Sequence, residues 1–218
     1  MAQTLQNILD DVASFIDQDT TLATGTELTI RVNFVNQALK EWSNAYQWKS
    51  LRVTHSPSFS LSAISLGLPT NFKKLMSPVY DMSKTTENEY PEIRAWERFT
   101  KVSTDRYVYQ SGDDASGYYL TINPALVSGA SIVLDYQSHA SSMATLADIC
   151  VCPQPQFVSR KVIGYILESR SDARFPQINA EADRLLLNMI EEENAASGGE
   201  NNRTPDIFRQ IKFRVGSD

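Results

Sequence analysis

One histidine in this chain of 218 residues stands next to possible nucleophiles. His55 is followed by Ser56 and Ser58, which are the residue types of a base and a nucleophile, but a triad also needs a third group that orients the histidine. Spacing alone does not supply that group, and no Gly-x-Ser-x-Gly, glycine-rich phosphate loop or His-Glu-x-x-His motif occurs. We therefore expect His55 to be a surface histidine at the end of a strand, in a protein that is not an enzyme.

The two cysteines, Cys150 and Cys152, are separated by one residue. In a strand such neighbours point to opposite faces, so they neither form a disulfide easily nor bind one metal ion together. A zinc site would need two more ligands, and the only histidines, His55 and His139, lie on other segments. Both cysteines are thus expected to be small buried hydrophobic residues, and we expect no metal ion and no cofactor.

Three runs of carboxylates remain as candidate cation ligands: Asp10-Asp11, Asp113-Asp114 and Glu191-Glu192-Glu193. A calcium site needs alternating oxygen ligands around a glycine-centred loop, and none of the three runs has that setting. The simpler interpretation is that they are solvated helix faces and turns.

The overall charge and hydropathy exclude two classes of partner. The formal net charge is -6, so no global basic field attracts nucleic acid or an anionic membrane. No apolar run approaches the ~20 residues of a membrane span, so we expect a cytosolic product that does not bind membranes.

The last segment of the chain has a different composition. Ser197-Gly198-Gly199 ends a helical pattern, and Glu200-Asn201-Asn202 continues as a polar spacer. The apolar residues beyond it are interleaved with basic ones and are too few to bury themselves. The alternative is a tail that frays or folds back on its own domain. Otherwise the segment binds a partner's surface through Ile207, Phe208, Arg209, Ile211, Lys212, Phe213 and Arg214.

Helical periodicity occurs at both ends of the chain, and alternation occurs between them. Apolar stripes predict helices over 4–16, about 29–46, 157–170 and 178–194. Trp42 and Trp48 are expected to pack in cores, one in the helical bundle and the other at its joint with the strands. Alternation and turn residues predict strands near 51–53, 59–61, 64–68, 72–79, 118–122 and 132–136. Residues 111–114 are expected to be a turn, and 91–99 a short helix with Ile93, Trp96 and Phe99 inward.

Separated amphipathic helices need a common core, so this order predicts an α+β fold in three parts. The helical bundle is built from both ends of the chain, residues 1–49 and 147–195. An antiparallel β-rich subdomain, residues 50–146, is inserted into it. Residues 196–218 form an extended C-terminal arm.

Three runs of the sequence resemble a known family. The run from Val32 to Trp42, VNFVNQALKEW, is followed by YQWKSL at 46–51 and by GLPTNFKKL at 67–75. Their order is similar to the opening of the head-to-tail adaptor (connector, neck) proteins of tailed bacteriophages, with an Asn-containing helix, an aromatic exit into strands and a Leu-Pro-x-Asp/Asn-Phe step. Residues 89–109 match nothing in that pattern.

The resemblance implies a virion structural protein that assembles in the host cytoplasm as a ring of about twelve copies. Such a ring would dock on the portal protein through the C-terminal arm, carry the next neck or tail protein, and let DNA pass without sequence-specific binding. One alternative is a tail-completion or other neck or tail protein. An alternative from a different class is a small host-directed or nucleic-acid-binding regulator.

Overall fold

The computed structural model describes residues 3–18, 23–57, 63–113 and 117–196, which form a mixed α+β fold of helices and antiparallel sheets. The chain separates into two compact units. We call Met1–Ser50 with Ala140–Asp218 the helical unit, and Leu51–His139 the β unit. The seven residues predicted to bind a partner, from Ile207 to Arg214, lie outside the described residues.

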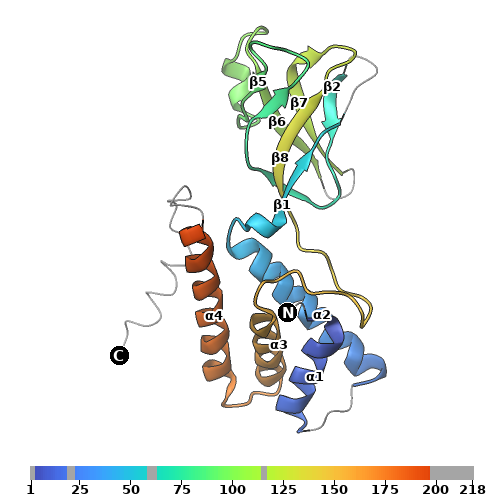
Figure 1. The fold of residues 1–218 in the computed structure, drawn as a ribbon, viewed down its shortest axis with the longest axis vertical. Helices are drawn as coiled ribbons and strands as arrows, with labels where there is room; N and C mark the ends of the chain where they lie inside the picture. The colour runs from blue at the N-terminus through green and yellow to red at the C-terminus, as the bar shows by residue number, and fades with distance from the viewer. Residues whose placement is uncertain (1–2, 19–22, 58–62, 114–116, 197–218) are drawn as a thin grey trace. The chain divides into compact units, whose positions relative to one another are not determined.

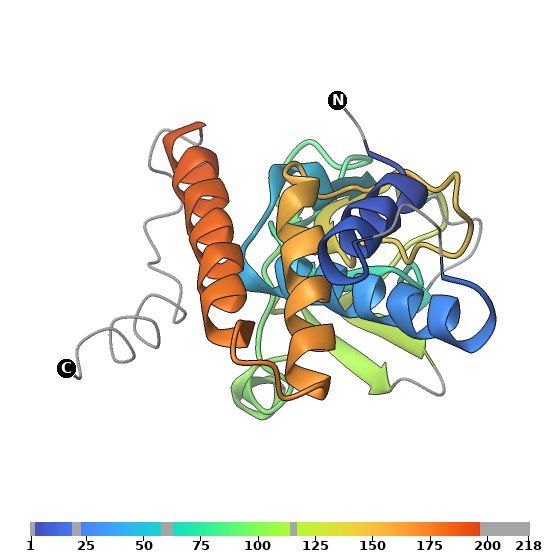
Figure 2. The same ribbon diagram turned by 90° about the horizontal axis from the view of Figure 1, so that it is seen from below.

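In its described ranges the helical unit contains four α-helices, of which α3 is the central one. In both ribbon views α3 lies between α1 and α4, and α4 lies at the edge of the unit with one face outward (Figures 1 and 2). Helix α3 packs against each of the other three. The helices are α1 (Leu5–Ile16), α2 (Gly25–Ala45), α3 (Pro155–Ser169) and α4 (Phe175–Ala196).

The start of each helix follows from local chemistry, and two starts differ from the sequence prediction. At α1 the Thr4 hydroxyl accepts from the Asn7 amide, and the Asn7 side chain accepts from the Thr4 amide, which is a reciprocal cap. Helix α2 begins at Gly25 rather than near residue 29. Helix α4 begins at Phe175, because a proline in the first turn, here Pro176, removes no helical hydrogen bond.

Trp42 and Trp48 pack together inside the helical unit. Their ring centroids lie 5.1 Å apart in a stacked arrangement, and the Trp48 Nε1–H donates to the Trp42 carbonyl oxygen at 2.7 Å. Both side chains are buried. The expectation of core packing is confirmed, and Trp48 packs directly on Trp42 within this unit.

The segment after Ala140 joins the helical unit through a pair of hydrogen bonds. The Asn36 side chain on α2 donates to the Met143 carbonyl oxygen at 3.0 Å and accepts from the Met143 amide at 2.8 Å. The Met143 side chain is buried. The sequence boundaries assigned residues 140–146 to the β-rich subdomain, whereas the structure places them with the helices.

Replacing Asn36 by alanine should destabilise the helical unit by about 1 to 3 kcal/mol, because both backbone groups of Met143 lose their partner. Asn33→Ala is the matched control, since Asn33 lies one turn earlier on α2 and is exposed. The control should be neutral or slightly stabilising through its better helix propensity. Equal melting temperatures of the two variants would show that the Asn36 contact contributes nothing.

The β unit consists of two antiparallel sheets (Figure 1). In the larger sheet β8 pairs with β1 along one edge and with β3 and β4 in succession along the other, and β5 pairs with β4. The smaller sheet has the order β2-β7-β6. The strands are β1 (Arg52–His55), β2 (Ala63–Gly67), β3 (Phe72–Leu75), β4 (Val79–Asp81), β5 (Glu89–Tyr90), β6 (Tyr107–Asp113), β7 (Gly117–Leu126) and β8 (Ile132–Ser138).

The β unit has a core of its own. Alternate residues of β8, namely Ile132, Leu134 and Tyr136, are buried, as a strand with one face on a core requires. They belong to a cluster that also contains Tyr90, Val108 and Leu120. A separate core of this kind allows the β unit to hold its own surface in shape.

Two expectations for the β unit are wrong and one is outside the described residues. Residues 91–99 do not form a helix: Pro91 and Ile93 pair with Val108, and only Glu97–Thr100 forms a 3₁₀ turn, called η2. Residues 111–113 continue β6 rather than forming a turn. The predicted strand at 59–61 cannot be compared, because residues 58–62 are not described.

Candidate interaction surface

The most exposed large apolar side chains of the β unit include a pair on one short segment. Trp96 is 60% exposed and Phe99 is 78% exposed, although tryptophan and phenylalanine usually bury most of their surface. Arg94, Arg98 and Lys101 are exposed on the same segment. We call Arg94, Trp96, Arg98, Phe99 and Lys101 the aromatic–basic surface.

The segment that carries this surface is fixed to the strands at both ends. Upstream, the Val108 amide donates to the Pro91 carbonyl at 2.9 Å, and the Ile93 amide donates to the Val108 carbonyl at 2.9 Å. Downstream, the Asn123 side chain on β7 donates to the carbonyl oxygens of Ser103 and Asp105. Trp96 and Phe99 therefore project from a positioned backbone, which lowers the entropy that a partner must remove on binding.

Arg98 connects η2 to β6. Its guanidinium donates to the Tyr109 hydroxyl at 2.9 Å and lies over the Tyr109 ring at 5.1 Å and the Phe99 ring at 4.7 Å. Each such contact at an exposed site contributes about 0.5 to 1 kcal/mol. Arg98 thus holds the Phe99 ring against the unit while the outer face of the ring stays in solvent.

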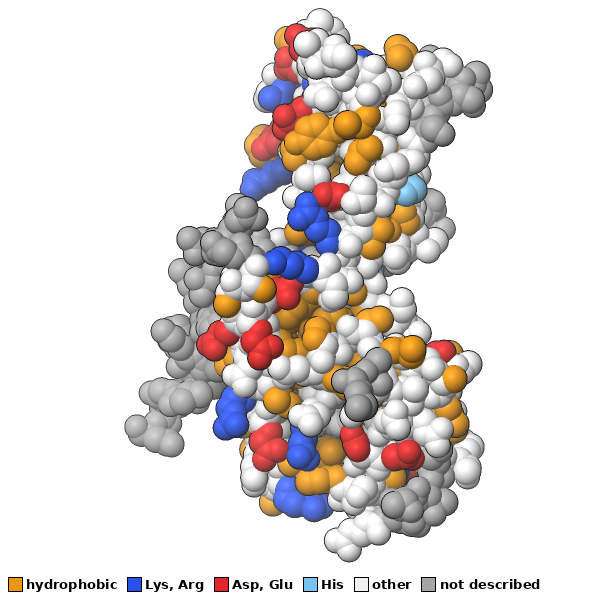
Figure 3. All heavy atoms as spheres, in the orientation of Figure 1, with side chains coloured by type: hydrophobic (Ala, Val, Ile, Leu, Met, Phe, Trp, Pro, Cys, Tyr) orange, Lys and Arg blue, Asp and Glu red, His pale blue; other side chains and the backbone are white. Residues whose placement is uncertain are grey.

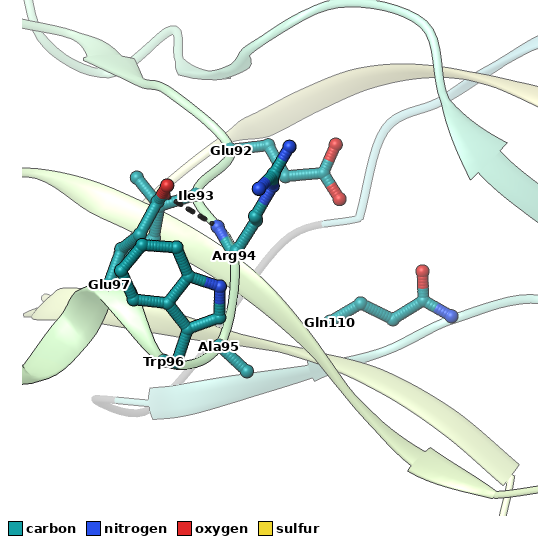
Figure 4. A pocket seen from close by; sticks show the side chains of 7 residues that line it. All are labelled: Glu92, Ile93, Arg94, Ala95, Trp96, Glu97 and Gln110. Carbon is teal, nitrogen blue, oxygen red and sulfur yellow. Dashed lines mark hydrogen bonds between the residues drawn. The ribbon is translucent and has the colours of Figure 1, made fainter.

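A hollow of about 650 Å³ lies beside Trp96. In the close view the side chains of Glu92 and Arg94 extend from the segment, the Trp96 indole stands near Glu97, and Gln110 comes from β6 on the other side (Figure 4). The remaining lining residues are Ile93 and Ala95. A mixed lining of one aromatic ring, charges and an amide is typical of a protein-binding surface.

The two carboxylates around the hollow, Glu92 and Glu97, have different surroundings. Glu97 accepts a hydrogen bond from the Arg94 amide at 3.0 Å, so its charge is turned onto the backbone. Glu92 is exposed as a whole residue. Protein atoms near its carboxylate nevertheless displace part of the surrounding water, and this desolvation raises the pKa of Glu92. The Arg94 guanidinium makes no ion pair with any described residue. Positive charge is therefore what this surface presents most strongly.

The helical unit has a second hollow, of about 460 Å³, between α1, α3 and α4. The Arg160 guanidinium lies over the Phe15 ring at 5.4 Å and pairs with Glu181 at 3.5 Å. The Ser159 hydroxyl donates to Asp11 at 3.4 Å. These side chains satisfy one another, so the hollow shows the packing of three helices rather than a ligand site.

The cysteines and the histidine that were considered for chemistry in the sequence are Cys150, Cys152 and His55. Cys150 and Cys152 are free and buried, and burial raises the pKa of the Cys152 thiol to about 12, so it stays protonated at neutral pH. They do not lie in a strand; only their neighbour Ile149 makes an isolated bridge, to Thr4. His55 ends β1, as expected. Among the residues that the structure describes, no group of three His, Cys, Asp or Glu side chains is placed to hold a metal ion.

Sequence reasoning missed the aromatic–basic surface because it assigned Trp96 and Phe99 to the inner face of a helix. One signal was available: the segment from Pro91 to Phe99 is only nine residues long, and interleaved Arg94 and Arg98 leave no continuous apolar stripe over that length. The exposed fraction of each ring depends on how Val108 pairs with the segment, which no local pattern reveals.

No protein-family model matches this chain, and no curated protein matches it. In the described ranges no helix combines the length and the hydropathy that crossing a bilayer requires.

Proposed function

We propose that this chain is a head-to-tail adaptor of a tailed bacteriophage, a virion structural protein without catalytic activity or cofactor. In this proposal the four helices form the bundle that packs into a ring of about twelve copies, and the ring docks on the portal protein through the C-terminal arm. The protein assembles in the host cytoplasm and becomes part of the virion at the junction of head and tail. The ring carries the next neck or tail protein and leaves a passage for DNA.

The order of the elements is the first support for this proposal. Helices from both ends of the chain, α1 and α2 with α3 and α4, pack in one unit, and the strands between them form a second unit with a separate core. This is the arrangement that the resemblance to adaptor proteins implies. It also gives each copy two bodies, each of which presents a surface of its own to the assembly.

The observation that carries the proposal is the exposed, positioned aromatic–basic surface of the β unit. A protein gains nothing in solution from exposing Trp96 at 60% and Phe99 at 78%, because burying either ring would stabilise it by roughly 1.5 to 3 kcal/mol. Tryptophan and arginine side chains on a fixed backbone are the usual centres of protein–protein contacts. Assembly with other proteins explains this surface directly.

Co-sedimentation with purified portal rings tests the proposed function. We expect the free protein to sediment as a monomer at micromolar concentration and to move with the portal when the two are mixed. DNA should not compete, because the chain carries net charge -6. A monomer that does not bind the portal but binds DNA with strong salt dependence would contradict the proposal. It would favour the alternative of a small nucleic-acid-binding regulator.

A further inference from the structure

The aromatic–basic surface carries basic side chains, whereas the net charge of the whole chain is negative. The chain has 26 acidic and 20 basic side chains, whereas Arg94, Arg98 and Lys101 gather within eight residues. A second copy of the chain, which is acidic overall, is therefore attracted electrostatically to this surface. Two copies meeting through the same surface would bring these cations together, which is unfavourable. A contact between copies through this surface must be head-to-tail, with a different face of the second copy.

A complementary face lies near the C-terminal end of α4. Glu191 and Glu192 are exposed there, and Gln154 donates to Glu192 at 3.4 Å, which places the loop before α3 beside α4. In that loop Val151 and Pro153 are exposed on either side of Cys152, whose thiol contacts the Met189 sulfur at 3.8 Å. We call Val151, Pro153, Glu191 and Glu192 the acidic–apolar face.

The position of these carboxylates favours a cationic partner. Glu191-Glu192-Glu193 stand near the C-terminal end of α4, where the helix dipole is negative and the last turn has no basic residue. One cation from outside the helix reaches this end, because the Lys49 ammonium donates to the Ala196 carbonyl oxygen at 2.9 Å. Glu193 already accepts from the Lys49 amide at 2.6 Å. Within the described part of the chain neither Glu191 nor Glu192 makes an ion pair, and apolar side chains are exposed in the neighbouring loop, which matches the combination of cations and rings on the aromatic–basic surface.

We propose that the aromatic–basic surface of one copy docks on the acidic–apolar face of the α4 end of the next copy. Trp96 and Phe99 cover Val151 and Pro153, and Arg94 and Lys101 meet Glu191 and Glu192. Each copy contributes one surface of each kind, so the contact is heterologous and closes into a ring when its rotation allows. This contact rests on the proposed function, of which it is the subunit interface.

Trp96 provides the measurement, because Trp42 and Trp48 are buried and only Trp96 of the three tryptophans is exposed. The full-length protein is concentrated at low salt toward about 1 mM, where contacts of about 4 kcal/mol become populated. Sedimentation velocity gives the association constant, and iodide quenching of tryptophan fluorescence gives the accessibility of Trp96. We expect quenching to fall as association proceeds, and both effects to diminish with added salt.

Four variants separate this contact from general charge effects. Trp96→Ala should weaken association at least tenfold, since a central tryptophan is the commonest kind of hot spot. Arg94→Glu/Lys101→Glu should weaken it about tenfold, and Glu191→Lys/Glu192→Lys should do the same. Combining all four reversals in one chain should restore it. Lys40→Glu/Arg170→Glu is the control, because it changes the net charge equally at exposed cations elsewhere.

Recovery of association in the fourfold variant, with Trp96 again protected, is the expected result. Any of three results would overturn the proposal: no association of the wild-type protein, wild-type association of Trp96→Ala, or no recovery in the fourfold variant. The portal takes no part in these measurements. Loss of the expected self-association results with intact portal binding would contradict the subunit contact alone. Absence of portal binding with intact self-association would contradict the proposed function.

Discussion

Deletion of residues 203–218 is expected to abolish attachment to the portal while leaving the melting temperature unchanged. The deleted segment carries all the predicted partner-binding residues. An extended chain spans ~3.3 to 3.6 Å per residue, so the part beyond Gly199 reaches on the order of 60 Å, enough to cross onto a neighbouring ring.

The size of this effect comes from the number of arms. Burying one large apolar side chain contributes roughly 1.5 to 3 kcal/mol, and ordering the backbone takes back about 1 to 2 kcal/mol per residue, so each arm binds weakly. About twelve arms on one ring raise the effective concentration of every further contact. Loss of all arms therefore changes tight docking into no detectable docking.

A matched variant separates the apolar side chains from the length of the arm. Replacing Ile207, Phe208, Ile211 and Phe213 by serine keeps the length and the basic residues, and it should abolish docking as the deletion does. Co-sedimentation with portal rings and thermal unfolding are the two measurements. Unchanged docking of the truncated protein, or unfolding several degrees earlier, would mean that the arm is part of the protein's own core.

Replacing Trp42 by alanine should destabilise the helical unit by about 3 to 5 kcal/mol, as for other large-to-small substitutions in cores. Trp42 is fully buried, and its removal also leaves the face of Trp48 without its stacking partner. At about 2 to 4 °C per kcal/mol for a chain of this size, the transition should fall by roughly 6 to 20 °C.

Trp96→Ala is the matched control for Trp42→Ala, because it removes the same side chain from a site that is 60% exposed. An exposed substitution of this kind should change stability by no more than about 0.5 kcal/mol. Differential scanning calorimetry of both variants checks the contrast. A similar loss of stability in the two would show that Trp96 packs into the β unit as deeply as Trp42 packs between the helices.

The helices were predictable because their signals are local. The stripe of Leu5, Ile8, Leu9 and Val12 repeats with helical period, and the structure buries all four residues on α1. Pro155 likewise stands in the first turn of α3. The predicted and observed helices differ at their ends. The apolar stripe predicts the last helix from residue 178, whereas α4 begins at Phe175, because the first turn of a helix accepts a proline such as Pro176.

The β unit was less predictable because its order depends on pairing between distant residues. Strand β8 uses both edges, and its partners β1, β3 and β4 start between 53 and 80 residues earlier in the chain. The pairing of Ile93 with Val108 turns a segment with helical spacing into an extended one, and Trp96 and Phe99 become exposed as a result. The exposure of these rings therefore depends on long-range pairing, and the short length and interleaved arginines of the segment were its one local signal.

The most direct test of the head-to-tail role is electron microscopy of purified portal rings after incubation with the full-length protein. We expect one added ring on the portal, with about twelve copies around an open passage, as the symmetry of a closed heterologous assembly requires. Single copies scattered on the portal, or particles without any added density, would contradict the proposed function.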